Sequence, residues 1–435
     1  MGLGFFSNSV CYGDTRLETQ EERPVPDYDG RAPADPSTGE VLLWVPRVVF
    51  FPAYLVTEYL IRTPLNWFGR AAELNSLPLI VVDFFTFGED QRYGLFPSIL
   101  VDFGFRTSFG LNFYMKRFLS DQDRLSISAA TAGQDWINLS VNESLPIGEN
   151  LLEVGGGFLR RPDYIFHGLG PSTTNQARTR YQAETLQAQA SYRYPLMKNG
   201  ALRFELGLRD ASFSGSQCCD EPDITDFIRR GRLGTPPRFD TGYTALRQRV
   251  DFQWGNAPSR PEEPIGGRTI LNLEHAFDVS GNQNSRWVLY GAMVQGYWNI
   301  WKDRVISVSL DTQFSDSLGD RSVPFFELPT LGGDRPLPGF LEGRLVGESA
   351  AAFTFEYTWP IQAFIDGVFH YGLGNVFDKG LKNFRLGLLR QSVGLGMQVG
   401  SGDSFGFLLA AGSRTIEEGA GFNNFRVQLR FISEL

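Results

Sequence analysis

The feature that most constrains this chain is a long series of segments, from about residue 98 onward, in which apolar and polar residues alternate. In RVISVSLDTQF (304–314), Ile306, Val308 and Leu310 fall on one face, with serine and aspartate on the other; ALRFELGLRD and FRVQLRF follow the same pattern. Successive side chains of a β-strand point to opposite faces, so each segment has one apolar and one polar side. The pattern predicts an all-β fold, but by itself it fits both a soluble sandwich and a membrane barrel.

Segment length separates these two folds. Strands of sandwiches are typically about 5–6 residues long, whereas a tilted strand that crosses a membrane needs roughly 9–11. Most of the alternating segments here exceed ten residues, which predicts a 16-stranded antiparallel transmembrane β-barrel. The predicted strands are 98–106, 108–118, 124–134, 135–146, 150–162, 179–196, 200–215, 243–255, 266–279, 286–301, 304–316, 348–361, 365–377, 384–400, 404–415 and 424–432.

The lengths of the gaps between these segments follow a pattern. The long gaps, 163–178, 216–242 and 317–347, follow the fifth, seventh and eleventh predicted strands, and most gaps after even-numbered strands are short. Long loops at one end and tight turns at the other are typical of outer-membrane barrels. The exception is 256–265, which contains the stiff sequence PSRPEEP.

Charge excludes one class of partner. The formal net charge is −9, and no Lys/Arg-rich run offsets it. Nucleic acids require a basic surface, so no nucleic-acid partner is predicted. Charged residues on the polar strand faces either line a path for solutes or pair with one another inside a lumen. They are Arg203, Glu205, Arg209, Asp251, Glu274, Asp311, Glu356, Arg426 and Arg430.

The sequence predicts neither a metal site nor a catalytic site. Cys11 and the adjacent Cys218 and Cys219 show no metal-ligand spacing, and the chain's three histidines are dispersed, so no cofactor or metal is predicted. GDSFG (402–406) matches a nucleophile elbow, which needs a strand–turn–helix setting and a later histidine. The last histidine is His370, so Ser404 is interpreted as a turn residue and the protein as no enzyme.

The N-terminal part differs in composition from the rest. Residues 1–40 are mostly polar and rich in proline and acid, which predicts disorder. Residues 41–78 are apolar but interrupted by prolines and charges, which favours short amphipathic helices at the membrane surface or the barrel mouth over a membrane-spanning helix. A processed signal segment is the remaining alternative. Residues 79–435 are assigned to the barrel. Envelope proteins are expected to bind through the helical segment.

A family resemblance becomes specific in LGGDRPLPGFLEGRLVGESAAAFTFEYTWPI (331–361), followed by FHYGLGNVFD (369–378). These stretches resemble the bacterial surface antigen superfamily of outer-membrane barrels, which includes BamA/TamA-type assembly barrels and two-partner secretion transporters. The resemblance implies sixteen strands, a location in a bacterial outer membrane and contact with its lipids. It also implies that the loop 317–347 folds back into the lumen.

The family's loop tip is hydrophobic-Arg-Gly-aromatic. Leu337, Gly339 and Phe340 match it, whereas Pro338 stands where the arginine is expected. The resemblance gives Glu356, on the following strand, the role of a lumen partner for the loop. Because the tip arginine is missing, Arg335 or Arg344 is the hypothesised partner of Glu356.

A second family motif, aromatic-x-Asp-x-Gly before a hydrophobic pair, resembles HYGLGNVF. Gly374 matches, with Asn375, Val376 and Phe377 after it, and Gly372 stands where aspartate is expected. The arginine expected at 338 and the aspartate expected at 372 are therefore both absent. A buried charge without its partner is costly, so the loss of both is physically consistent.

The resemblance implies a role in the insertion or export of proteins or lipids at the outer membrane. Family members that move proteins carry receptor modules ahead of the barrel, and the stretch before the first predicted strand fits no such module. Two alternatives therefore stay open: a structural subunit or anchor of an outer-membrane complex, and a passive or gated pore.

Overall fold

The computed structural model describes residues 84–256, 265–280, 285–301, 304–319, 321–362, 365–399 and 406–432. The predicted disordered segment 1–40, the predicted helices in 41–78 and Ser404 lie outside the described residues.

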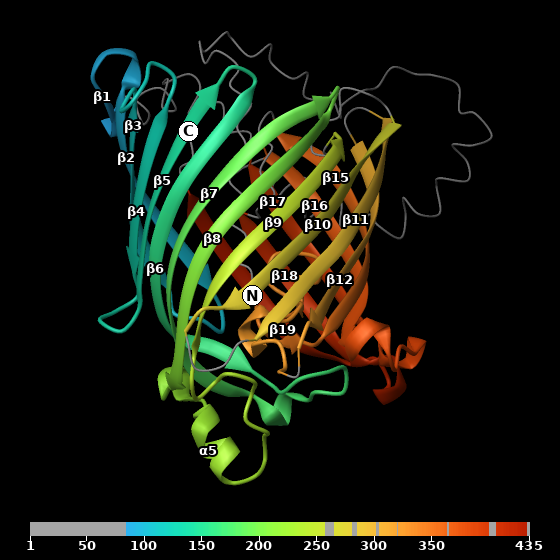
Figure 1. Cartoon of the computed structure of the whole chain (residues 1–435). Helices are drawn as coiled ribbons and strands as arrows, with labels where there is room; N and C mark the ends of the chain where they lie inside the picture. Colours follow the sequence, from blue (N-terminus) through green and yellow to red (C-terminus); the bar gives the residue numbers. More distant parts are fainter. Residues whose placement is uncertain are drawn as a thin grey trace, which may run out of the picture.

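Sixteen antiparallel strands form one closed barrel (Figure 1). Each strand pairs with the next along the chain, and the last pairs with the first, which closes the cylinder. The strands are β2 Tyr93–Asp102, β3 Ser108–Lys116, β4 Arg124–Thr131, β5 Ile137–Ile147, β6 Asn150–Phe166, β7 Thr179–Met197, β8 Gly200–Gly215, β9 Tyr243–Gly255, β10 Ile265–Asp278, β11 Arg286–Trp301, β12 Arg304–Ser317, β15 Ser349–Gln362, β16 Ile365–Phe377, β17 Arg390–Val399, β18 Phe407–Thr415 and β19 Phe422–Ile432. A further two-residue strand, β1 Thr86–Phe87, pairs with the start of β2.

The predicted number and order of strands are confirmed, and the largest differences in bounds concern the strands predicted as 98–106 and 384–400. β2 begins at Tyr93 and ends at Asp102, because Gly104 has a positive φ of 112° and the chain turns there. β17 begins at Arg390, later than the predicted start at 384. The preceding 3-10 turn Leu386–Leu388 packs Leu388 against Phe377 instead of extending the strand.

Alternating side chains give the barrel an apolar outside and a polar inside. Large outward side chains are open to the surroundings, as at Leu206 (54% exposed), Leu310 (52%) and Phe353 (41%), whereas Ser307 and Glu356 on the inner face are buried. In lipid, a closed barrel is the sheet that leaves no backbone edge unpaired. Within the described residues, no helix is both long and apolar enough to cross a bilayer.

Four long connections, 167–178, 216–242, 318–348 and 378–389, leave the same end of the barrel, which we call the loop end. The short helix α5, Ile224–Arg229, belongs to the second of these and marks that end in Figure 1. In the same connection, Cys218 and Cys219 form a disulfide with each other. The opposite end, with mostly tight turns, is the turn end.

An aromatic core holds the loop end together inside the wall. Phe325 and Phe326, in the connection between β12 and β15, pack against rings of β6 to β9 and of the connection 216–242. The rings involved are Tyr164, Phe166, Tyr181, Phe213, Phe239 and Tyr243. The start of the connection 318–348 is therefore anchored in the bore by apolar burial.

Candidate functional site: the lumen loop and the barrel seam

The connection 318–348, which we call the lumen loop, contains a small hairpin. Thr330–Leu331 (β13) pairs with Leu345–Val346 (β14), and residues 332–344 form the tip segment between them. Leu337 and Phe340 are fully buried in a cluster with Ala350, Ala352 and Val376 of the barrel wall. The residues that resemble the family tip therefore lie against the inner face of β15 and β16.

Gly339 makes the closest approach of the loop to the wall. Its N–H donates to Ser392 Oγ at 2.8 Å. A Cβ at this position would lie 2.2 Å from the carbonyl oxygen of Ala411 and 2.7 Å from the N of Gly412. Both of these are backbone atoms, so glycine is the residue that allows the tip to dock against β17 and β18. The adjacent Pro338 is also buried.

Glu356 receives two partners inside the lumen. Arg335 Nε lies 3.1 Å from Glu356 Oε1, and His370 Nδ1 lies 3.0 Å from the same oxygen. Of the two arginines proposed as its partner, the structure places Arg335 there. Arg344 instead donates to Thr173 Oγ1 at 2.8 Å and to Thr173 O at 3.0 Å.

Arg344 is 2% exposed, and its partners are neutral oxygens of the connection 167–178, including Asn175 Oδ1 at 3.2 Å. Burial lowers the pKa of Arg344, and the nearby Arg390 and Arg178 lower it further, to about 9. Its hydrogen bonds tie the lumen loop to the neighbouring connection.

The second motif lines the same site from β16. Gly374 sits so close to β15 that a Cβ would lie 2.6 Å from Ala351 O. Asn375 is fully buried and donates from Nδ2 to Leu388 O at 2.6 Å and to Pro171 O at 3.1 Å. Val376 and Phe377 are also fully buried, in separate clusters on the two sides of the strand.

The lumen loop also reaches the wall opposite the closing strands. Glu327 Oε1 accepts from Arg209 Nη1 at 3.0 Å and from the hydroxyl of Tyr243, on β8 and β9. Burial raises the pKa of Glu327, but Arg209 and Arg247 outweigh this and hold the pKa below its usual range. Glu327 therefore stays charged and paired.

At the other side of the bore, the tip segment meets the seam, by which we mean the pairing of β19 with β2. Arg426 of β19 makes two bonds to Asp102 of β2, from Nε to Oδ1 at 2.9 Å and from Nη2 to Oδ2 at 2.7 Å. The same guanidinium donates from Nη1 to Gly333 O and from Nη2 to Asp334 Oδ1 at 3.2 Å. One side chain of the last strand thus contacts both the first strand and the loop.

Six of the charges assigned to the lumen face from the sequence form ion pairs, each with a partner that the assignment did not include. The pairs are Arg203 with Glu153, Arg209 with Glu327, Arg249 with Asp251, Arg247 with Glu274, Arg335 with Glu356 and Arg426 with Asp102. Sequence reasoning missed Asp102, Glu327 and Ser392 as partners of the loop and its neighbours. The available signal was an acid beside aromatic residues, as in VDFGF and FFELP.

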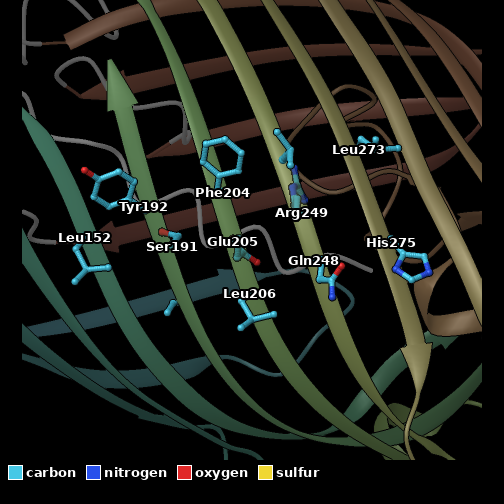
Figure 2. A pocket seen from close by; sticks show the side chains of 12 residues that line it. Leu152, Ser191, Tyr192, Phe204, Glu205, Leu206, Gln248, Arg249, Leu273 and His275 are labelled. Atoms are coloured by element: carbon cyan, nitrogen blue, oxygen red, sulfur yellow. The ribbon is translucent and has the colours of Figure 1, made fainter. Parts of the chain in front are cut away.

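A groove lies elsewhere, on the outer wall of β6 to β10 (Figure 2). Its lining includes the exposed, outward Tyr192, Phe204 and Leu206, with the polar Gln248 beside His275. Among the described residues, no group of three or more His, Cys, Asp or Glu side chains is arranged to hold a metal ion. The described site is therefore the loop and the wall it contacts.

The match to a family model decides the identity of the fold. Residues 94–409 match the Omp85 superfamily domain, which is most of the chain. The chain belongs to the Omp85 superfamily. The predicted family is thereby confirmed. This Omp85 protein is an outer-membrane barrel of a bacterium, in contact with lipid, and its family consists of transport and assembly barrels, not of enzymes.

Solved structures show the same fold at low sequence identity. BamA from Haemophilus ducreyi lacking POTRA domains 1-3 superposes with a TM-score of 0.54 at 14% identity, over 78% of this chain and 70% of that one. CdiB from Escherichia coli gives a TM-score of 0.52 at 12% identity, over 78% of this chain and 63% of that one. This chain thus spans less than two thirds of the CdiB chain. No curated protein sequence matches it significantly.

Proposed function

We propose that this barrel assists the insertion or export of proteins or lipids at the outer membrane, and that a client strand adds at the seam. The observation that carries the proposal is the shortness of the seam. Ser98–Asp102 pairs with Gln428–Ile432, five residue pairs in the described part of the chain, whereas β2 and β3 join eight and β18 and β19 join seven. Among the described residues, fewer residue pairs hold the seam than hold either neighbouring pairing, so we expect the barrel to open there.

A reversible staple tests this proposal. Val101 and Leu429 are register partners, so cysteines at both positions can form a disulfide across the seam. In liposomes containing the barrel and a urea-unfolded outer-membrane barrel protein, oxidation of V101C/L429C should abolish client insertion, and reduction should restore it. The matched control is V250C/L273C, which staples β9 to β10 on the far wall. Equal activity of the oxidised seam variant and the control would overturn the proposal.

A gated pore is the second candidate, and the paired charges along the lumen wall favour it, because a polar bore can hold water. The lumen loop crosses that bore from Arg209 on one side to Arg426 on the other. Conductance in planar bilayers should therefore be low for the full chain and rise when residues 331–347 are deleted. A bilayer that stays silent after the deletion would exclude the pore. The structural anchor rests on 41–78, outside the described residues.

A further inference from the structure

We infer that Arg426 couples the lumen loop to the seam: the docked loop keeps the seam closed, and displacement of the loop lets the seam open more readily. This inference rests on the proposed function, because it names how opening of that same seam is regulated. The inference goes beyond the proposed function because it assigns control of the seam to the guanidinium of Arg426 and to the two loop residues that bond to it.

The geometry makes Arg426 the meeting point of three parts of the chain. Asp102 lies 324 positions away in sequence and accepts hydrogen bonds from both Nε and Nη2 of the guanidinium. Gly333 and Asp334 of the tip segment occupy the remaining side. A planar guanidinium that is bonded on two sides is held in one orientation, the one that suits the carboxylate of the first strand.

The docked loop strengthens the ion pair between Arg426 and Asp102 because it keeps both side chains buried. Arg426 is 3% exposed and Asp102 is 8% exposed. Charged pairs contribute strongly when they are buried and fully bonded, whereas pairs in contact with water contribute little. If the tip segment leaves, Arg426 loses two hydrogen bonds and water reaches the pair. This buried contact across the seam then becomes an ordinary hydrated ion pair.

The effect concerns a short pairing. Among the described residues the seam has five residue pairs, so the loss of one buried ion pair should weaken it more than the same loss would weaken a longer pairing. Coupling of this kind is reciprocal: if loop docking favours a closed seam, a closed seam favours loop docking by the same factor. A client strand that opens the seam would therefore also loosen the loop.

Hydrogen exchange of backbone amides, measured on the purified barrel without client, tests the coupling. The loop-side variant is Asp334→Ala, which alters neither seam strand. We expect amide exchange in 98–102 and 428–432 to rise about tenfold, the change that corresponds to weakening one buried pair to the level of an exposed one. The control is Glu342→Ala, because Glu342 of the same tip segment pairs with Arg161 of β6, which belongs to neither seam strand. It should leave the seam amides unchanged.

A second pair of variants separates coupling from general loosening. Arg426→Lys keeps the charge but cannot bond Asp102 through two nitrogens, and seam exchange should rise. Arg247→Lys makes the same change at the buried two-bond pair of Arg247 with Glu274, between β9 and β10, and should affect those strands alone.

The reverse effect, of the seam on the loop, is tested with the V101C/L429C barrel. Amides of 332–344 should exchange more slowly when its disulfide is oxidised than after reduction. Seam exchange that is unchanged in Asp334→Ala, or raised equally by Glu342→Ala or Arg247→Lys, would overturn the coupling. Because no client is present, failure of the insertion assay leaves this result intact, and failure of the coupling leaves the insertion proposal intact.

Discussion

Replacement of Gly339 by alanine should release the lumen loop while leaving the barrel closed. The added Cβ would lie 2.2 Å from Ala411 O, 2.3 Å from Ala411 C and 2.7 Å from Gly412 N. These atoms belong to paired strands of the wall and cannot move aside, so the tip must retreat. The retreat stretches the bond from Gly339 N–H to Ser392 Oγ and withdraws Phe340 from its fully buried position.

The magnitude follows from these two losses. A buried hydrogen bond contributes about 1 kcal/mol net, and burial of a phenylalanine side chain contributes about 2 kcal/mol. Loop docking should therefore weaken by about 3 kcal/mol, or roughly a hundredfold in the equilibrium between docked and released loop.

Limited proteolysis and hydrogen exchange of residues 330–346 measure loop docking directly. The control is Gly319→Ala, because Gly319 lies in the same loop and no heavy atom lies within 4 Å of the added Cβ. The folded barrel is verified by its unchanged mobility in unheated gels. If Gly339→Ala protects the loop as well as the original residue, or behaves as Gly319→Ala does, the close approach does not hold the tip in place.

Three further predictions test the wall, the lumen and the turn end. Leu310→Arg places a charge on the lipid face and should destabilise the barrel by about 2–4 kcal/mol in a urea titration, whereas the inward Gln313→Arg should cost much less. Glu356→Lys should release the loop by about 3 kcal/mol, seen as protease cleavage within 330–346; unchanged cleavage would mean that the contact with Arg335 is incidental. Burial raises the pKa of Asp123, in the turn after β3, but the N–H groups of 118–120 donate hydrogen bonds to its carboxylate, and its pKa is lowered overall. Because the folded pKa is lowered, this stabilisation is present above the usual pKa and is lost as pH falls through the folded one, so Asp123→Asn should be less stable than the original barrel at pH 7 and equal to it in strong acid.

The barrel itself could be predicted because lipid imposes a simple rule on every strand. Outward positions such as Leu206, Leu310 and Phe353 must be apolar and inward positions can be polar, so alternation marks each span. Alternation does not identify strand ends where a segment extends beyond the lipid. At 384–389 the residues are still partly apolar, but they pack on Phe377 at the loop end and form a 3-10 turn instead of the start of a strand.

Contacts of the lumen loop could be predicted only in part. The resemblance directed attention to Glu356 and to the tip because those residues stand in a motif. Arg426 and Asp102 form no local pattern, since 324 positions separate them and barrel closure alone brings them together. Glu327 likewise meets Arg209 across the bore, and a polar residue on the wet face of a strand gives no sign of its partner.

The two departures from the family motifs have a common physical basis. Gly372 stands where an aspartate is expected, and a Cβ there would lie 2.6 Å from Leu337 Cδ2 and 3.0 Å from Pro336 O. The missing side chain therefore leaves the space that Leu337 occupies, and an aspartate would force this tip outward. With that acid absent, an arginine at position 338 would have one carboxylate fewer to bond, and the buried Pro338 brings no charge into the cluster. Glu356 is retained, and Arg335, three residues earlier in the loop, lies 3.1 Å from it. We propose that apolar contact at Gly372 and a shifted arginine together replace the family's ion pairs, so the loop keeps a charged anchor to β15 although its tip has become apolar.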